Sequence, residues 1–289
     1  MRRLFFTRFR LLFAFILTPA LCWVVSALLA EEPPADKAGG KTPTIAPPTK
    51  KELADKRMQF MKKALARYTI QVGEREEPAT VGDPCLRWTN PIDGAADGIV
   101  AVYAYKGGRP AALGQLFLND MKQWCNEFTI IAESDVTIMR SDRVFWKPSE
   151  YVCKFTDLPN SPTPADKAVA RVAQMRAIAA DFSVIDYFKG NRTNLRLLRQ
   201  PVYRYAEEGK ILDGALFVFA VGTDPDCALL LEAYQGKDGS CYRYALAPIT
   251  VFKLEVSYKD RLVWSLTGAH GRSILSSPYR PEPGEALPK

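Results

Sequence analysis

The feature that most constrains the fold of this chain is an internal repeat with a spacing of about 114 residues. Residues 49–52 (Thr-Lys-Lys-Glu) form a capping box, in which the threonine and glutamate side chains satisfy free backbone amides at a helix start. Residues 163–166 (Thr-Pro-Ala-Asp) are a variant with proline at the first helical position, where its missing N–H costs nothing. Each box is followed by apolar residues at helical spacing, which predict one buried helix face. They are Ala54, Met58, Met61, Leu65 and Tyr68 in the first copy, and Ala168, Val172, Met175, Ala179 and Phe182 in the second.

Further matches follow each predicted helix in the same order. Their spacing drifts from 114 to 118 residues, as small insertions in loops would produce. The matched pairs are Arg87-Trp88 with Arg204-Tyr205, Asp97-Gly98 with Asp213-Gly214, Cys125 with Cys241, and residues 142–146 with residues 260–264. This shared order predicts a tandem duplication. Trp146 and Trp264, which end the last pair, are expected in the core.

Short β-rich segments with turn residues between them predict hairpins in each copy. They are residues 99–105 with 111–118, 136–139 with 143–146, 215–221 with 226–234, and 254–258 with 261–264. Runs of strands with segregated helices favour an α+β fold with antiparallel sheets. We therefore expect two tandem homologous units, residues 49–160 and 161–268, each with one helix followed by an antiparallel multi-stranded sheet. A cleft between them is the expected ligand site. Residues 269–289 form a C-terminal tail, of which residues 277–289, with four prolines, are expected to be loose.

The N-terminal residues predict export from the cytoplasm. Arg2, Arg3, Arg8 and Arg10 precede residues 11–30, which carry no charge. Residues 1–30 therefore form either a cleaved signal peptide or an uncleaved membrane anchor. Both alternatives place the rest of the chain in the periplasm or cell envelope, with membrane contact only through residues 11–30. Residues 31–48 are rich in proline and small residues and predict a flexible linker.

Charge and motif content exclude several classes of function. The formal net charge of +7 falls to +3 when the four N-terminal arginines are set aside. This small excess and the exported location argue against a nucleic-acid partner. The sequence has no P-loop, no GxGxxG and no CxxC motif, so we expect neither a cofactor nor a metal site.

Cysteine chemistry leaves two hypotheses. His270 is the only histidine, so a cysteine nucleophile, Cys125 or Cys153, would need it as the base. The alternative places His270 in a surface loop between glycines. Cys125 and Cys241, at matched places in the repeat, could form a disulfide between the units. The alternative is that the cysteines are buried thiols that pack as small hydrophobic side chains.

Opposite charges occupy corresponding stretches of the two copies. The first stretch holds Glu74, Glu76, Glu77 and Asp83, and the second holds Arg192, Arg196, Arg199 and Arg204. Their attraction would favour self-association or an envelope-protein partner, with the arginines as binding residues. The alternative is two solvated hairpins of unequal charge. Asp97 and Asp213 each precede a glycine and are expected in turns rather than as a catalytic pair.

One resemblance bears on the location of the protein. Residues 212–217 (Leu-Asp-Gly-Ala-Leu-Phe) and 222–225 (Gly-Thr-Asp-Pro), together with the signal and the proline-rich linker, resemble a family of exported bacterial proteins with no assigned function. The resemblance covers most of residues 60–265, implies a bacterial protein of the cell envelope and carries no site residues. We expect a non-enzymatic binding or scaffold protein of the envelope. The alternative is an envelope hydrolase with a cysteine nucleophile and His270 as its base.

Overall fold

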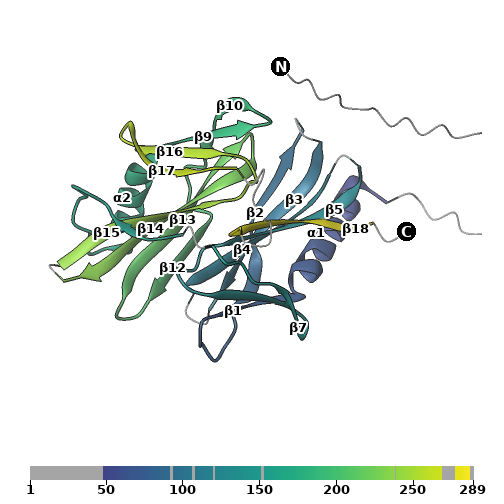
Figure 1. Cartoon of the computed structure of the whole chain (residues 1–289), viewed down its shortest axis with the longest axis horizontal. Helices are drawn as coiled ribbons and strands as arrows, with labels where there is room; N and C mark the ends of the chain where they lie inside the picture. The colour runs from purple at the N-terminus through teal and green to yellow at the C-terminus, as the bar shows by residue number, and fades with distance from the viewer. Residues whose placement is uncertain are drawn as a thin grey trace, which may run out of the picture. The chain divides into compact units, whose positions relative to one another are not determined.

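The computed structural model describes residues 48–91, 94–105, 108–119, 121–150, 153–237, 239–268 and 277–286 (Figure 1). The predicted signal or anchor, the linker up to residue 47, and His270 lie outside these residues. The described chain is mostly β, with two helices and four antiparallel sheets, and each helix is followed by strands. To this extent the predicted combination of helices and antiparallel sheets is confirmed. Within the described ranges, no helix is long and apolar enough to span a membrane.

Helix α1 (Lys50–Leu65) begins at the predicted capping box. The Thr49 hydroxyl oxygen accepts a hydrogen bond from the Glu52 backbone N–H at 3.2 Å, and the Glu52 carboxylate accepts one from the Thr49 N–H at 2.7 Å. Two free amides of the first turn are thereby satisfied. Met61 and Leu65 form the buried face of the helix, as the apolar spacing predicts.

Helix α2 (Ala168–Ala180) begins later than the sequence predicts. Its N-cap is Lys167, whose side chain makes no capping hydrogen bond, so the predicted box at residues 163–166 is wrong. The reason is that two helix side chains bind this segment instead. The Gln174 amide donates to the Thr163 carbonyl and accepts from the Ala165 N–H, each at 2.9 Å, and Arg171 donates to the Ala165 carbonyl at 3.0 Å. Residues 163–166 are thus held beside the helix and do not form its first turn.

Two small antiparallel sheets follow the helices in the chain. The first has the order β1-β6-β7 and consists of β1 (Tyr68–Val72), β6 (Val136–Arg140) and β7 (Arg143–Trp146). The second has the order β10-β9-β16-β17 and consists of β9 (Phe182–Phe188), β10 (Asn191–Asn194), β16 (Leu254–Tyr258) and β17 (Arg261–Leu266). The hairpins β6–β7 and β16–β17 are among those that the sequence predicts.

Two long antiparallel sheets form the centre of the fold (Figure 1). The first, in the order β18-β5-β4-β3-β2, contains β2 (Thr80–Asn90), β3 (Ala95–Ala104), β4 (Pro110–Leu118), β5 (Gln123–Ile130) and β18 (Tyr279–Ala286). The second has the order β11-β13-β14-β15-β8, and β12 also pairs with β13. Its strands are β8 (Thr156–Asp157), β11 (Arg196–Leu197), β12 (Tyr203–Glu207), β13 (Ile211–Val221), β14 (Asp224–Gly236) and β15 (Gly239–Pro248). The term "first half" denotes the elements from α1 to β7, and "second half" denotes the elements from α2 to β17.

The edge strands β8 and β18 exchange places between the long sheets. Strand β8 follows the first half in sequence and pairs with β15, whereas β18 follows the second half and pairs with β5. The expectation of a loose C-terminal tail is therefore wrong for Tyr279–Ala286, because this segment is a strand in the ladder of β5. Main-chain hydrogen bonds thus tie each half to a segment that follows the other half.

The core has an inner layer and two outer layers. Inner faces of the two long sheets pack together through Val100, Val102 and Leu113 of the first and Leu216, Leu230 and Ala245 of the second. The outer face of the first long sheet packs against α1 and the first small sheet, and that of the second packs against α2 and the second small sheet. Trp146 is buried as predicted, and Trp264 packs partly buried against the core of the second half.

A repeated contact explains the Arg-aromatic and Asp-Gly pairs of the sequence. Arg87 binds Asp97 at 2.7 Å, and Arg204 binds Asp213 at 2.5 Å. Both aspartates are buried and lie within strands, Asp97 in β3 and Asp213 in β13. The expectation that they lie in turns is therefore wrong. The adjacent glycines admit an aromatic ring. A Cβ at Gly98 would lie 2.6 Å from Trp88, and one at Gly214 would lie 2.4 Å from Tyr205.

The two halves share the register of their strand pairs. In the small sheets, Ile70 lies opposite Ile138 and Ile138 opposite Trp146, while Val184 lies opposite Val256 and Val256 opposite Trp264. A bulge follows the second pair in both sheets. In the long sheets, a bulge separates Tyr103 from Ala104, and another separates Phe219 from Ala220. In both sheets the alanine after the bulge lies opposite a proline. These pairings define matched positions between the halves.

Candidate functional site

A cavity of about 260 Å³ lies between the two halves, where the first long sheet meets the β13–β14 turn and strands β9 and β10. We call it the acidic cavity. Its carboxylates are Glu127, Asp186, Asp224 and Asp226, its amides are Asn90 and Gln115, and its aromatic side chains are Phe117, Phe188, Phe252 and Tyr279. None of the described residues that line it is basic. A cleft between the halves is the place where the sequence analysis expects a ligand.

Asp186 is the most unusual residue of the acidic cavity. It lies on β9 at a position that alternates with Phe182 and Val184, so strand geometry turns its side chain toward the core. The residue is 1% exposed, and neither carboxylate oxygen accepts a hydrogen bond. Burial raises its pKa to about 6, and the backbone N–H of Tyr187, which is directed to the Lys253 carbonyl at 3.0 Å, offsets only part of the rise. A buried carboxylate without a partner is costly to a fold, which makes this position a candidate for ligand contact.

The other carboxylates of the cavity are also perturbed. Glu127 accepts a hydrogen bond from the Gln115 amide at 2.8 Å, and burial raises its pKa to about 8. Burial also raises the pKa of Asp226 well above its ordinary value, and the negative charges of Asp224, Asp186 and Glu127 add to this effect. Asp224 accepts a hydrogen bond from the Asn90 amide at 2.8 Å. The charges of the other three acids therefore act on Asp226 in one shared, desolvated space.

Four polar residues of the acidic cavity occupy positions where the other half carries apolar residues, whereas Asn90 and Asp224 match the charged Glu207 and Arg109. Asp186 lies opposite Leu254, and Val72 lies opposite Val136. Leu254 and Val136 occupy matched positions in the two halves, so Asp186 matches Val72. In the same way Asp226 matches Ala111, Gln115 matches Leu230, and Glu127 matches Ala245. The fold is thus compatible with an apolar side chain at each of these four places. The polar groups are not required for the strand pairing.

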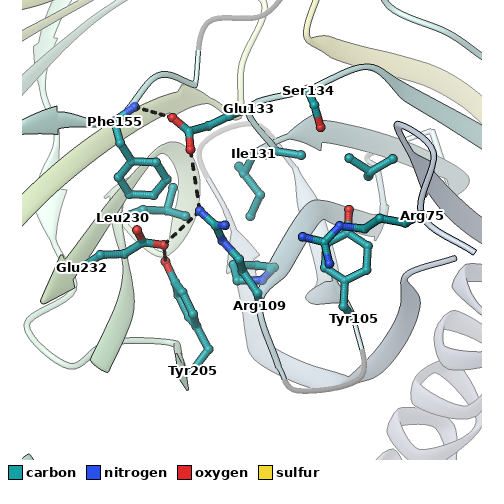
Figure 2. Close-up of a pocket in the computed structure, with 13 residues that line it drawn as sticks. Arg75, Tyr105, Arg109, Ile131, Glu133, Ser134, Phe155, Tyr205, Leu230 and Glu232 are labelled. Carbon is teal, nitrogen blue, oxygen red and sulfur yellow. Dashed lines mark hydrogen bonds and ion pairs between the residues drawn. The ribbon is translucent and has the colours of Figure 1, made fainter. Parts of the chain in front are cut away.

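A second polar cluster lies at the matched place between the halves, and ion pairs join its Arg109 to Glu133 and Glu232 (Figure 2). Glu232 has no exposed surface, yet Arg243 binds it at 2.6 Å, the Tyr205 hydroxyl donates to it at 2.8 Å, and Arg109 lies 3.7 Å away. Arg109 also lies 3.2 Å from Glu207 and 3.6 Å from Glu133. We call this group the Arg109 cluster. Only about 80 Å³ of space remains beside it, so we interpret it as a structural ion-pair network.

The four arginines that the sequence singles out do not form one site. Arg204 binds Asp213, and Arg192 is exposed on β10. Arg196 and Arg199 line one groove together with Arg176 of α2, which sequence reasoning missed. Of the opposing acidic residues, Glu74, Glu76 and Glu77 are exposed, and Asp83 binds Lys62 at 2.5 Å. Self-association through these charges stays a prediction.

The cysteines are distributed over separate parts of the structure. No disulfide joins Cys125 to Cys241. The predicted correspondence of Cys125 with Cys241 is wrong. Cys125 pairs with Phe117 in the first half, and the matched pair in the second half is Arg243 with Glu232, so Cys125 corresponds to Arg243. Cys153 is buried between the long sheets, and burial raises the pKa of its thiol above the usual range, which disfavours a thiolate nucleophile. A partnership of Cys125 or Cys153 with His270 stays untested. Among the described side chains, no group of three or more histidine, cysteine or acidic residues is arranged to hold a metal ion.

The sequence contained one signal for the acidic cavity. At matched positions of the two halves, the β9 segment reads Phe182, Val184, Asp186 where the β1 segment reads Tyr68, Ile70, Val72. An aspartate in place of a core valine marks a position where the chain departs from its own pattern. The remaining residues of the cavity come from both halves and only the fold brings them together. Comparison with protein-family models, with curated proteins and with solved structures finds no match for this chain.

Proposed function

We propose that this protein is an exported, non-enzymatic binding protein of the bacterial cell envelope, and that it holds a small molecule with a protonated amine in the acidic cavity. The observation that carries the proposal is Asp186, a buried carboxylate with no hydrogen-bond donor on either oxygen, which lines a cavity with acidic neighbours. An ammonium group supplies both the N–H donors and the positive charge that this carboxylate lacks.

The shape and chemistry of the cavity favour an organic cation over a metal ion. The acids are not arranged as a metal cluster among the described residues. The aromatic rings that line the cavity suit the apolar part of an amine and attract its charge. At about 260 Å³ the cavity lies near the lower end of the roughly 300–1,000 Å³ of ligand pockets, so the ligand is small.

The matched positions support an origin of this site by tandem duplication followed by divergence. We propose that the two halves descend from one ancestral unit, whose pairing with a second copy created two matched spaces between the long sheets. In one space Arg109 and Glu232 pair with oppositely charged neighbours. In the other, acids replaced apolar residues and no basic residue among those described accompanies them. Duplication thereby supplied two matched spaces, one filled by a stabilising ion-pair network and the other lined by acids that a ligand can pair with.

Three amines of different shape test the proposal: 2-phenylethylamine, 1,4-diaminobutane and butylamine. We expect saturable binding of at least one of them at pH 8 by titration calorimetry. The uncharged analogue 2-phenylethanol and calcium chloride are expected to give no comparable signal. The variant Asp186→Asn, which keeps the side-chain shape without the charge, is expected to bind at least tenfold more weakly. Asp142→Asn, in the exposed β6–β7 turn, is the matched control and should bind as the unsubstituted protein does. Failure of all three amines, or equal binding by Asp186→Asn, contradicts the proposal.

The pH dependence of amine binding follows from the raised carboxyl pKa values. Alkylamines stay protonated well above pH 8, so the titrating groups are Asp186, whose pKa burial raises to about 6, and Glu127, whose pKa burial raises to about 8. Both must lose a proton to carry the negative charge that pairs with the ammonium group. Affinity is therefore expected to rise at least tenfold from pH 5 to pH 8. Affinity that is flat or falls over this range means that the amine does not pair with these acids.

A further inference from the structure

A groove of about 680 Å³ on the second half lies between α2 and the segment that includes β11. We call it the arginine groove. Its basic residues are Arg176, Arg196 and Arg199, and Ala177, Ala180 and Leu197 contribute exposed or half-exposed apolar surface. None of the described residues that line it is acidic. It thus combines three positive charges with an apolar wall.

The arginines of the groove are held by neutral groups. Arg196 donates a hydrogen bond to the Gly222 carbonyl, and Arg176 donates one to the Gln200 side chain. In the described chain none of the three arginines forms an ion pair with a carboxylate, whereas Arg87, Arg109, Arg171, Arg204 and Arg243 all do. No carboxylate among the described residues therefore neutralises the positive charge of the groove.

The corresponding region of the first half holds an acid–base pair. Thr80 and Val81 lie opposite Ala104 and Tyr103, as Arg196 and Leu197 lie opposite Ala220 and Phe219. Asp83 follows Val81 by two residues, as Arg199 follows Leu197, and a bulge after Val81 interrupts the ladder of the first half. On the helices, Lys62 and Arg176 each follow a buried methionine at matched positions. Lys62 binds Asp83 at 2.5 Å, so the first half places an ion pair in a region where the second half carries Arg176 and Arg199.

Two like charges in place of an ion pair oppose each other unless an anion lies between them. We propose that the arginine groove binds an anionic amphiphile, a small molecule whose phosphate or carboxylate head pairs with the arginines and whose apolar chain lies along Ala177, Ala180 and Leu197. Guanidinium groups bind such oxyanions with two parallel hydrogen bonds. This site is independent of the acidic cavity, since the two linings share no residue.

The test uses dodecyl phosphate below its critical micelle concentration as the probe, with titration calorimetry as the readout. Arg199→Asp copies the ion pair of the first half and is expected to fold while binding dodecyl phosphate at least tenfold more weakly. Arg199→Gln is a second variant that removes the charge without adding an acid, and it should also bind more weakly. Arg192→Gln, on β10 outside the groove lining, is the matched control and should leave binding unchanged.

Two further probes separate the contributions of head and chain. Inorganic phosphate is expected to bind at least tenfold more weakly than dodecyl phosphate, because it lacks the chain. Dodecyltrimethylammonium, with the same chain and the opposite charge, is expected not to bind. Equal binding of both amphiphiles, equal binding of inorganic phosphate, or unchanged binding by both Arg199 variants overturns the proposal. Circular dichroism shows in each case that the variant is folded.

Discussion

The variant Asp186→Val is expected to be more stable than the unsubstituted protein and to bind no amine. Valine fits at this place because Val72 occupies the matched position of β1, where it is buried. The substitution removes a carboxylate that is 1% exposed and has no hydrogen-bond partner. A rise in the free energy of unfolding combined with a loss of binding is what a residue kept for a ligand, and not for the fold, should show.

The size of this gain in stability depends on pH. Burial raises the Asp186 pKa from 3.8 to about 6, which corresponds to roughly 3 kcal/mol of destabilisation once the group is ionised in both states. Because the folded-state pKa is the higher one, the cost is absent below about pH 4, grows up to about pH 6 and is constant above it. Urea unfolding at pH 4, 6 and 8 should therefore show a small gain at pH 4 and the full gain at pH 8.

Two comparisons make the result of Asp186→Val decisive. The reciprocal variant Val72→Asp places a carboxylate in the matched core of the first half and is expected to lose stability at pH 8. Asp142→Val changes an exposed aspartate and is expected to shift stability by less than about 0.5 kcal/mol. A lower stability of Asp186→Val at pH 8 would show that the carboxylate supports the fold, and the case for a ligand would fail.

The variant Arg243→Met is expected to lower the free energy of unfolding by about 3–5 kcal/mol, the largest loss of stability among the proposed variants. Arg243 makes two contacts with Glu232, at 2.6 and 2.7 Å, and Glu232 has no exposed surface. Methionine keeps much of the side-chain length but leaves a buried carboxylate with the Tyr205 hydroxyl at 2.8 Å and Arg109 at 3.7 Å. Urea unfolding monitored by circular dichroism measures the loss.

A double variant and a surface control interpret that loss. Glu232→Leu combined with Arg243→Met removes both charges, and Arg109 retains Glu207 and Glu133, so the double variant is expected to recover most of the stability. Lys210→Met breaks an exposed ion pair with Glu207 and should cost less than about 1 kcal/mol. If Arg243→Met cost no more than Lys210→Met, the Arg109 cluster would not be the structural network we interpret it to be.

Local signals predicted the helices and several hairpins, because these depend on residues close in sequence. The Thr49 box fixes the start of α1, and the turns between apolar runs fix the β6–β7 and β16–β17 hairpins. Helix α2 shows the limit of such signals. Its start depends on Gln174 and Arg171, which bind the preceding segment from within the helix, and no capping motif records that contact.

The candidate site was only partly accessible to the sequence. A cleft between two repeats was expected on general grounds, but its residues come from strands on both halves, including β18 of the C-terminal tail. The charge pattern of the sequence indicates exposed arginines as binding residues. It does not indicate Asp186, because a buried acid and a surface acid are written alike in the sequence. Only the register between the halves shows that Asp186 stands where a valine would suffice.

The exchange of edge strands has a consequence for how the protein is completed during synthesis. Ribosomes release the chain from its N-terminus, so β5 emerges about 150 residues before its partner β18. Until then β5 is an open sheet edge with unpaired N–H and C=O groups, which other chains can join. The first half is therefore completed only by a strand that is made after the second half. Loss of residues 277–289 would leave that edge permanently exposed, and the expected phenotype is aggregation of an otherwise intact chain.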